Sequence, residues 1–351
     1  MTSRITRVQD VLPADEALLV TKPANVRYLS GYSGSNGIVL LTQSDATLFT
    51  DSRYAIQASS ECFDVNIVIS SDLFKGAAEL AKGSDLQIEA RHLTVGAFNR
   101  LSDLLAPNRI KVSAVGIESF RVVKDENEIA LIEQACQIAT SALNQVTSIN
   151  LIGRTEREIA RLLEFEMLNL GAEAIGFETI VASGPNSAIA HHQPTGRALS
   201  QGDLLKIDFG ARVSGYHSDC TRTFVAGKPN QWQQDLYSLV LSAQTNSRSV
   251  LTGGVTASEV VKPTMVEFEK AGLLTNFGHG LGHGVGLEIH EDPFLSNKLD
   301  DTLDPGTVLT VEPGLYFPDQ GGVRIEDTVV VTSYGYRTLT DYSYDLIEIG
   351  K

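Results

Sequence analysis

The chain has 351 residues, 42% of them hydrophobic, which is more than one core usually supports and enough to bury two. Its 43 acidic against 28 basic residues give a formal net charge of −15, which argues against nucleic acid or an anionic membrane as a partner. Because no run approaches about 18 apolar residues, no apolar secretion signal opens the chain, and its three cysteines lack CxxC spacing, we expect a cytoplasmic protein.

Residues 1–120 alternate short apolar runs with amphipathic stretches. The runs at 17–20, 37–41 and 46–49 predict strands, and the stretches at 53–61, 74–82 and 98–105 predict helices. This alternation is typical of an α/β domain. We therefore predict an N-terminal α/β domain over residues 1–120 and a second domain over residues 121–351.

The second domain opens with two helical patterns. From Asp125 apolar residues recur at positions 129, 132, 135, 136 and 139, and Asp125 with Glu128 fits a capped helix start. A second pattern begins near Thr155, runs to Leu170 and is stopped by Gly171. Two long helices are therefore expected before the strand-rich remainder of the chain.

Two pairs of carboxylates lie on strand-like runs in the last 150 residues. If residues 204–210 and 216–225 pair around a turn at Val213–Ser214, Asp208 faces Asp219. A hairpin centred on Asp319 places Glu312 opposite Glu326. Opposed side chains on one sheet face lie roughly 4.5–5.5 Å apart, and like charges there repel. Such pairs are usually solvated when they occur singly, but two of them favour a compensating cation, and a metal is the simplest one.

A glycine-rich segment with three histidines, residues 278–290, strengthens the metal hypothesis. Glycine contributes little to a core and permits a backbone to approach a ligand closely. Oxygen donors together with one imidazole, His283, suit manganese, cobalt, iron or zinc. The segment lacks the strand and third glycine of a dinucleotide fingerprint, and HExxH and GxSxG motifs are absent from the sequence.

These motifs together resemble the pita-bread metallopeptidases of family M24, and within it the branch of aminopeptidase P and prolidase. The resemblance covers at least residues 177–349 and rests on the stretches at 183–195, 206–224, 278–293, 310–318 and 321–328. It implies an α+β pita-bread catalytic domain over 121–351. Residues 25–37 and 50–54 resemble the creatinase-like N-terminal domain of aminopeptidase P, which in the family shapes the substrate mouth and contributes to a dimer. A homodimer is therefore expected.

The resemblance also implies two divalent metal ions, with manganese expected first and cobalt, zinc or iron as alternatives. It implies that Asp208 binds one ion, that His283 and Glu312 bind the other, and that Asp219 and Glu326 bridge them. In the family a bridging water or hydroxide is the nucleophile. Glu312 is the expected proton shuttle.

Further site residues follow from the resemblance and from strand position. His191 matches the substrate-facing histidine of the family, and His279 and His290 match its two accessory histidines. All three are expected to stabilise the oxyanion or to protonate the leaving nitrogen. Arg324 lies two residues before Glu326 on the same strand face, so it is expected to hold a carboxylate ligand charged. His192 has no family match, and His217 has a weaker claim to a supporting role.

The expected substrates are proline-containing peptides cleaved at the Xaa-Pro bond. Prolidases that resemble this chain carry an arginine after the His-Glu motif, and here Phe294 occupies that position. Burying the free carboxylate of a C-terminal proline beside an aromatic ring is costly, which favours an Xaa-Pro aminopeptidase acting on longer peptides. An Xaa-Pro dipeptidase is the alternative. A pita-bread protein without peptidase activity is a remote third possibility, since its relatives lack some ligands that this sequence retains.

Overall fold

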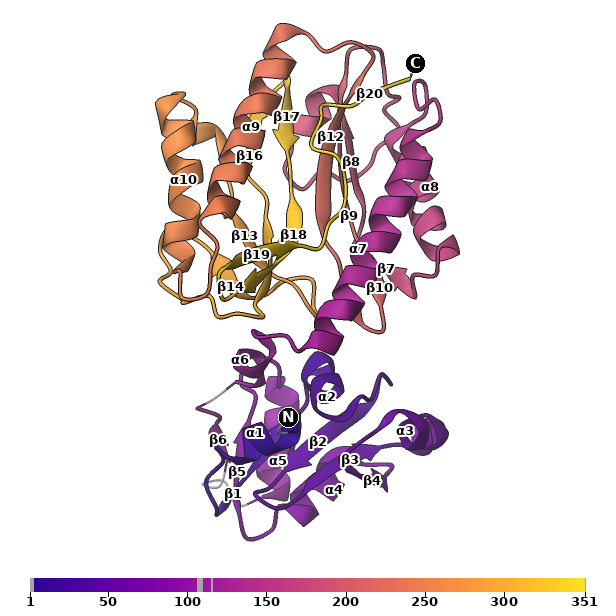
Figure 1. Cartoon of the computed structure of the whole chain (residues 1–351). Helices are drawn as coiled ribbons and strands as arrows, with labels where there is room; N and C mark the ends of the chain where they lie inside the picture. Colours follow the sequence, from indigo (N-terminus) through magenta and orange to yellow (C-terminus); the bar gives the residue numbers. More distant parts are fainter. Residues whose placement is uncertain (1–2, 106–109, 115, 351) are drawn as a thin grey trace. The chain divides into compact units, whose positions relative to one another are not determined.

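A computed structural model describes residues 3–105, 110–114 and 116–350 (Figure 1). The chain forms two compact units, Met1–Arg121 and Val122–Lys351, and each is described by itself. No helix among the described residues is long and apolar enough to cross a membrane.

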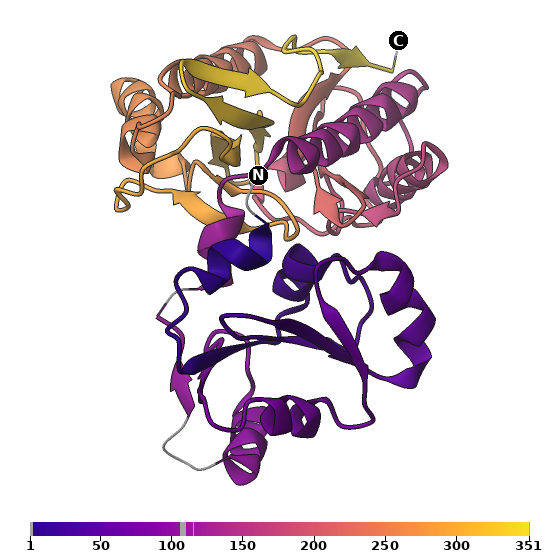
Figure 2. The ribbon, with the colours of Figure 1, turned by 60° about the horizontal axis from the view of Figure 1, so that its bottom comes forward.

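The first unit is built on one six-stranded mixed sheet in the order β4-β3-β2-β1-β5-β6. Figure 2 shows helices on both of its faces. The strands are β1 (Glu16–Val20), β2 (Gly37–Leu41), β3 (Ala46–Thr50), β4 (Asn66–Ile69), β5 (Asp85–Ile88) and β6 (Ile110–Val112). The helices are α1 (Arg4–Gln9), α2 (Pro23–Ser30), the 3-10 turn η1 (Ser52–Tyr54), α3 (Ala55–Glu61), α4 (Leu73–Leu80), α5 (Val95–Leu104) and α6 (Ile117–Arg121).

The three strands expected in this unit are present as β1, β2 and β3, and the expected helices are α3, α4 and α5 within a few residues. The helix expected from residue 53 differs at its start, because Asp51 caps a 3-10 turn and the α-helix begins only at Ala55. One core cluster lies between the sheet and α4 and α5, where Leu19, Leu40 and Phe49 pack against Ala77 and Leu101. The unit is therefore an α/β layer structure, as its alternating pattern predicts.

The second unit has four long helices beside several small sheets (Figure 1). They are α7 (Glu126–Thr147), α8 (Glu156–Asn169), α9 (Gln231–Ser249) and α10 (Ala257–Lys270), with the 3-10 turns η3 (Gly184–Ala188) and η4 (Leu274–Asn276). Asp125 and Thr155 form reciprocal capping boxes with Glu128 and Glu158, and Gly171, at φ 103°, follows α8. The starts expected for the first two helices, and the stop expected for the second, are thus present.

The strands of this unit fall into four sheets. Their orders are β11-β10-β7, β20-β12-β9-β8, β14-β13-β15-β18-β19 and β16-β17. The bounds are β7 (Ala174–Ile175), β8 (Ile180–Ser183), β9 (Leu204–Phe209), β10 (Ala211–Val213), β11 (Tyr216–His217), β12 (Cys220–Ala226), β13 (Gly282–Gly284), β14 (Glu291–Leu295), β15 (Val308–Val311), β16 (Gly314–Phe317), β17 (Gly321–Arg324), β18 (Asp327–Thr332), β19 (Gly335–Thr338) and β20 (Glu348–Ile349).

The register expected for the first carboxylate hairpin is wrong by two residues. Thr221, not Asp219, lies opposite Asp208. The reason is the turn, which lies at Ser214–Gly215, where both residues have positive φ (46° and 84°). A two-residue turn of this kind suits glycine and disfavours the valine that the expected turn would have used. Because side chains alternate with a period of two, this slip keeps the two aspartates on one face.

The register of the second hairpin is as expected. In β16 and β17 Gly314 lies opposite Arg324, and in β15 and β18 Val311 lies opposite Asp327. Glu312 and Glu326 lie between these two strand pairs. Both pairs have the same register, in which residue 312 is opposite residue 326. The structure therefore keeps the two glutamates opposed, as the hairpin predicts.

Candidate metal centre and active site

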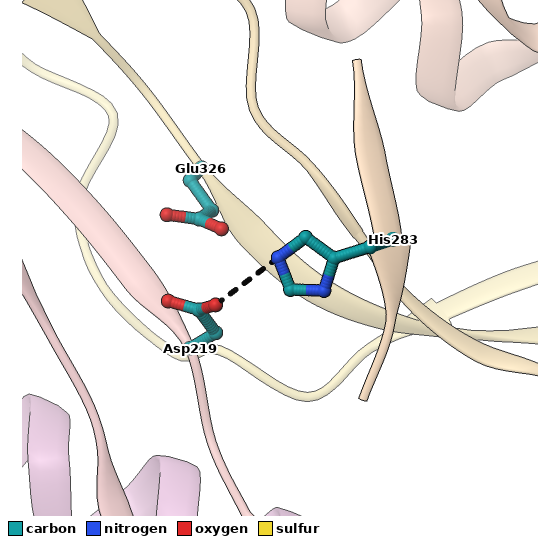
Figure 3. A group of neighbouring side chains, drawn as sticks. All are labelled: Asp219, His283 and Glu326. Atoms are coloured by element: carbon teal, nitrogen blue, oxygen red, sulfur yellow. Dashed lines mark ion pairs between the residues drawn. The ribbon is translucent and has the colours of Figure 1, made fainter. Parts of the chain in front are cut away.

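Three of the five expected ligands form one tight group. Asp219 precedes β12, His283 is the middle residue of β13, and Glu326 immediately precedes β18 (Figure 3). One ligand atom from each lies within 4.8 Å of the others, and all three residues are buried. The Nε2 atom of His283 is 3.5 Å from Asp219 Oδ2. Segments far apart in the sequence thus bring two carboxylates and an imidazole to one point.

The ring of His283 is held in the orientation that a metal ligand needs. Its Nδ1 atom lies 3.0 Å from the carbonyl of Gly284, which can only accept, so Nδ1 carries the proton. Its Nε2 atom is left facing the carboxylates and lies 3.5 Å from Glu312 Oε1. Burial lowers the pKa of His283 to about 4. A neutral imidazole whose second nitrogen donates to a backbone carbonyl is the usual form of a metal-bound histidine.

Asp208 is paired with Arg324 on one side only. Arg324 is buried and donates to Asp208 Oδ2, and its Nε donates to the hydroxyl of Thr221 over 2.9 Å. The other oxygen, Asp208 Oδ1, is buried and has no hydrogen-bond partner among the described residues. An unsatisfied carboxylate oxygen inside a protein is costly, and a cation is the partner that suits it.

Burial, and then the charges of Glu326, Asp208 and Glu312, raise the pKa of Asp219 well above the ordinary carboxyl range. The pKa of Glu326 is likewise raised by burial and by neighbouring carboxylates, and burial raises the pKa of Glu312 to about 8. So many buried acids repel one another unless positive charge is added. Carboxylate oxygens with one imidazole are a donor set that divalent transition metals accept, so the residues fit the expected metals.

His279 is linked to Arg324 through a residue that the sequence did not single out. The carbonyl of Gly280 accepts from His279 Nδ1 over 2.7 Å, so Nε2, 2.8 Å from the hydroxyl of Tyr316, accepts from that hydroxyl. Arg324 Nη1 in turn donates to the same hydroxyl over 3.0 Å. Both ring nitrogens of His279 are therefore engaged, and burial lowers its pKa to about 4. This arrangement differs from the expectation that His279 donates to the substrate.

The candidate ligands open into a cavity of about 470 Å³. His191 and His290 line it and are both exposed, and the ring of His290 lies 4.4 Å from that of His283, centroid to centroid. Its other walls include Phe177, Glu178, Thr179, Ile180, His192, Gln193, Pro194, His279, Gly280, Gly282, Ile289 and Phe294. Neither lysine nor arginine is among these lining residues. The cavity thus combines an acidic floor, two accessible imidazoles and apolar walls.

The two remaining histidines of this unit have structural partners. His192 is buried and its Nε2 lies 2.9 Å from Glu156. His217 lies opposite Arg212, and its Nδ1 donates to the carbonyl of Gly286 over 3.0 Å. It is buried but does not line the cavity.

The glycines around His283 serve neighbouring strands rather than a ligand. A Cβ at Gly282 would lie 2.0 Å from the carbonyl oxygen of Thr310, and a Cβ at Gly284 would lie 2.4 Å from that of Asp292. Both contacts are impossible for any side chain, so β13 must carry glycine on both sides of His283 for β14 and β15 to pack against it. The expectation of close approach is correct, but the approaching atoms belong to the protein.

Similarity to known proteins agrees with this geometry. The chain is similar to an Xaa-Pro dipeptidase of Pyrococcus horikoshii, 38% identical over 334 residues that cover 95% of this chain and 94% of that relative. Among solved structures it is similar to an Xaa-Pro dipeptidase from Bacillus anthracis (TM-score 0.94, 34% identity, 99% and 98% covered). It is also similar to an X-Pro aminopeptidase from Thermotoga maritima (TM-score 0.91, 34% identity, 98% and 100% covered).

Two family profiles together match most of the chain. The Creatinase/Prolidase N-terminal domain matches residues 4–123, and Metallopeptidase family M24 matches residues 130–333. The fold class expected for both halves, an α/β domain followed by an α+β pita-bread domain, is thereby confirmed. With more than half of its length matched by the catalytic profile, the chain belongs to metallopeptidase family M24.

Proposed function

We propose that this chain is an exopeptidase that hydrolyses the Xaa-Pro bond with two divalent metal ions held by Asp208, Asp219, His283, Glu312 and Glu326. The observation that carries the proposal is the buried group of Asp219, His283 and Glu326, whose ligand atoms lie within 4.8 Å of one another. The unpartnered Oδ1 of Asp208 supports the presence of further positive charge. Manganese is proposed first because oxygen donors outnumber nitrogen.

Two divalent ions bound there would lower the pKa of a water molecule and polarise the scissile carbonyl. The chain's own residues then orient and exchange protons. Arg324 holds the Asp208 carboxylate in place through a direct contact. Glu312, 3.5 Å from His283 and partly exposed, is proposed to accept and deliver the proton. His191 and His290, the imidazoles exposed in the cavity, are proposed to stabilise the oxyanion and to protonate the leaving nitrogen.

The proposed selection for proline follows from the missing N–H of the Xaa-Pro amide bond. An Xaa-Pro amide has no N–H, so a site that offers no acceptor there and an apolar wall for the pyrrolidine ring accepts proline at low cost. Phe177, Pro194, Ile289 and Phe294 supply apolar wall in this cavity. These residues support a proline-containing peptide as the substrate.

Two peptide lengths have support from different observations. The similar proteins favour the dipeptidase alternative, because the relatives from Pyrococcus and the structure from Bacillus anthracis are named Xaa-Pro dipeptidases. The cavity favours longer peptides, since none of its lining residues is a lysine or arginine that could pair with a free proline carboxylate, and Phe294 is 43% exposed. We propose cleavage of both lengths, with the ratio set at Phe294.

The test is steady-state hydrolysis of Ala-Pro and Ala-Pro-Ala by protein stripped of metal and reloaded with manganese, cobalt, zinc or iron. Ala-Ala-Ala is the control for proline specificity. Phe294→Arg should raise kcat/KM for Ala-Pro relative to Ala-Pro-Ala, and Phe294→Leu, which adds no charge, should not. Full activity after exhaustive chelation, or equal cleavage of Ala-Ala-Ala, would refute the proposed function.

The proposed assembly rests on the resemblance alone, and the proposed location rests on the sequence features that predict a cytoplasmic protein. We propose that the chain forms a homodimer in the cytoplasm and that its N-terminal unit contributes to the substrate mouth. Light scattering coupled to size exclusion measures the mass directly. A mass near 37.9 kDa, that of one chain, would contradict the dimer.

A further inference from the structure

The segment that presents His191 to the cavity closes on a single buried carboxylate. We name residues 183–195 the His191 loop. Glu156, in the first turn of α8, is fully buried and accepts six hydrogen bonds of 2.6–2.9 Å from the two ends of this loop. The donors are the backbone N–H and hydroxyl of Ser183, the amide of Asn186, Nε2 of His192, and the backbone N–H and hydroxyl of Thr195.

Only an ionised carboxylate can accept from all of these groups, because a protonated one would present its own donor to them. Burial by itself raises the pKa of Glu156, but the bonds from Thr195, His192, Ser183 and Asn186 outweigh it and lower this pKa to about 2. Since the carboxylate only accepts, His192 carries its proton on Nε2. The buried His192 is thus fixed immediately beside the exposed His191.

The backbone of the loop is also held by two buried basic side chains. Lys206 on β9 is fully buried, and its Nζ donates to the carbonyls of Ser187 (3.1 Å), Ile189 (2.6 Å) and Ala190 (3.3 Å). Arg324 also donates to the carbonyl of Ala190 over 3.0 Å. The backbone on both sides of His191 is therefore bound at short range, while its own ring remains exposed in the cavity.

We propose that Glu156 is a positioning residue that fixes His191 relative to the candidate metal ligands by closing the two ends of the His191 loop. The inference rests on the role proposed above for His191. Glu156 does not line the cavity, so it acts only through the loop. A displacement of about 1 Å at a group that meets the substrate can lower turnover about 100-fold, so a clamp of this kind has a measurable effect.

Glu156→Gln is the matched substitution because it preserves shape. Whichever way the new amide turns, its NH₂ group meets a backbone N–H, that of Ser183 or that of Thr195, so one end of the loop loses its acceptor. We expect kcat for Ala-Pro-Ala to fall about 10- to 100-fold with little change in KM. Glu156→Asp, which keeps the charge on a shorter stem, should recover part of this loss.

A double-mutant cycle separates positioning from general destabilisation. If Glu156 acts through His191, adding Glu156→Gln to His191→Ala should lower kcat no further. Glu128→Gln is the control, because Glu128 is a buried glutamate in the first turn of α7 that accepts from the backbone of Asp125 and the hydroxyl of Tyr216. It should destabilise the fold and leave kcat unchanged. The proposal would be overturned if the double variant lost kcat by the product of the losses that Glu156→Gln and His191→Ala cause singly.

Hydrogen exchange tests the clamp without any assay of activity. The amides of Ser183 and Thr195 should exchange faster in Glu156→Gln than in wild type, and at the wild-type rate in Glu128→Gln. Unchanged exchange over 183–195 would overturn the proposal even if turnover falls. If the wild type hydrolyses no Xaa-Pro peptide, the proposed function fails, and the exchange rates still decide whether Glu156 holds the loop.

Discussion

A buried ionic cluster beside the candidate metal ligands is the part of the fold that a single substitution should destabilise most. Asp327, fully buried next to Glu326, accepts hydrogen bonds from Arg222 (2.7 Å), Gln244 (2.7 Å) and Tyr344 (2.8 Å), and forms an ion pair with Arg248 (3.0 Å). The same Arg222 is about 1% exposed, and its Nη1 donates to the backbone carbonyl of Glu326. The cluster therefore both neutralises buried arginines and fixes the backbone at Glu326, a candidate metal ligand.

Asp327→Asn keeps the shape of the side chain and removes its charge. Arg222 is then left buried without a compensating charge, and breaking a buried ion pair in this way costs about 3–5 kcal/mol. Because asparagine retains one accepting oxygen, we expect a loss of about 3 kcal/mol in the free energy of unfolding. An exposed pair gives the contrast. Glu133→Gln, facing Arg337 with both side chains at least one-third exposed, should cost less than about 1 kcal/mol.

The assay is urea unfolding of the metal-free protein, followed by fluorescence and circular dichroism. The double variant Asp327→Leu with Arg222→Met removes both charges and should recover most of the loss, because apolar residues often replace a buried pair without penalty. A loss below about 1 kcal/mol for Asp327→Asn, no larger than that of Glu133→Gln, would refute the reasoning.

Three further predictions concern the site and its support. Asp219→Ala should abolish turnover and reduce bound metal, measured by elemental analysis, with an unchanged circular dichroism spectrum; activity that survives would exclude Asp219 as a ligand. Tyr316→Phe removes the hydroxyl that donates to His279 and accepts from Arg324, and should lower kcat about 10-fold, because two hydrogen bonds of roughly 0.5–1.5 kcal/mol each are lost. The pKa of Glu156 is about 2 in the folded protein and 4.5 in the unfolded chain. Its ionised carboxylate therefore adds about 3 kcal/mol to the free energy of unfolding above pH 4.5, and this contribution is lost as the pH falls towards 2. The melting temperature of Glu156→Gln should therefore vary less than that of wild type between pH 5 and about 2.5; equal slopes would contradict this.

The candidate ligands could be predicted from the sequence because the information is local. Hairpin register depends on a few turn residues, and the turn around Asp319, at φ 63°, lies where the symmetric hairpin places it. The first hairpin was misplaced by two residues although Ser214–Gly215 carries the signal, since glycine readily adopts positive φ and valine does not. The helix starts at Asp125 and Thr155 were readable for the same local reason.

The supporting contacts could not be predicted, because they join residues that are distant in sequence. Glu156 meets Ser183 across 27 positions and His192 across 36, and Tyr316 meets His279 across 37. The periodicity of apolar residues predicts that a position is buried, but it does not predict which residue that side chain contacts. A buried glutamate in the first turn of a helix looks like an ordinary favourable charge near the helix dipole. Only the folded chain shows that it closes a loop.

The paired glycines beside His283 limit how the site can be altered by design. Positions 282 and 284 accept no side chain, because Thr310 and Asp292 already occupy the space that a Cβ would need. A library that randomises this strand would therefore return mostly unfolded protein. Variation in substrate preference has to enter through the apolar wall, at Phe177, Ile289 and Phe294, where side chains face open space in the cavity. The strand of His283 is thus a fixed part of the scaffold, and the apolar side chains that line the cavity are its adjustable part.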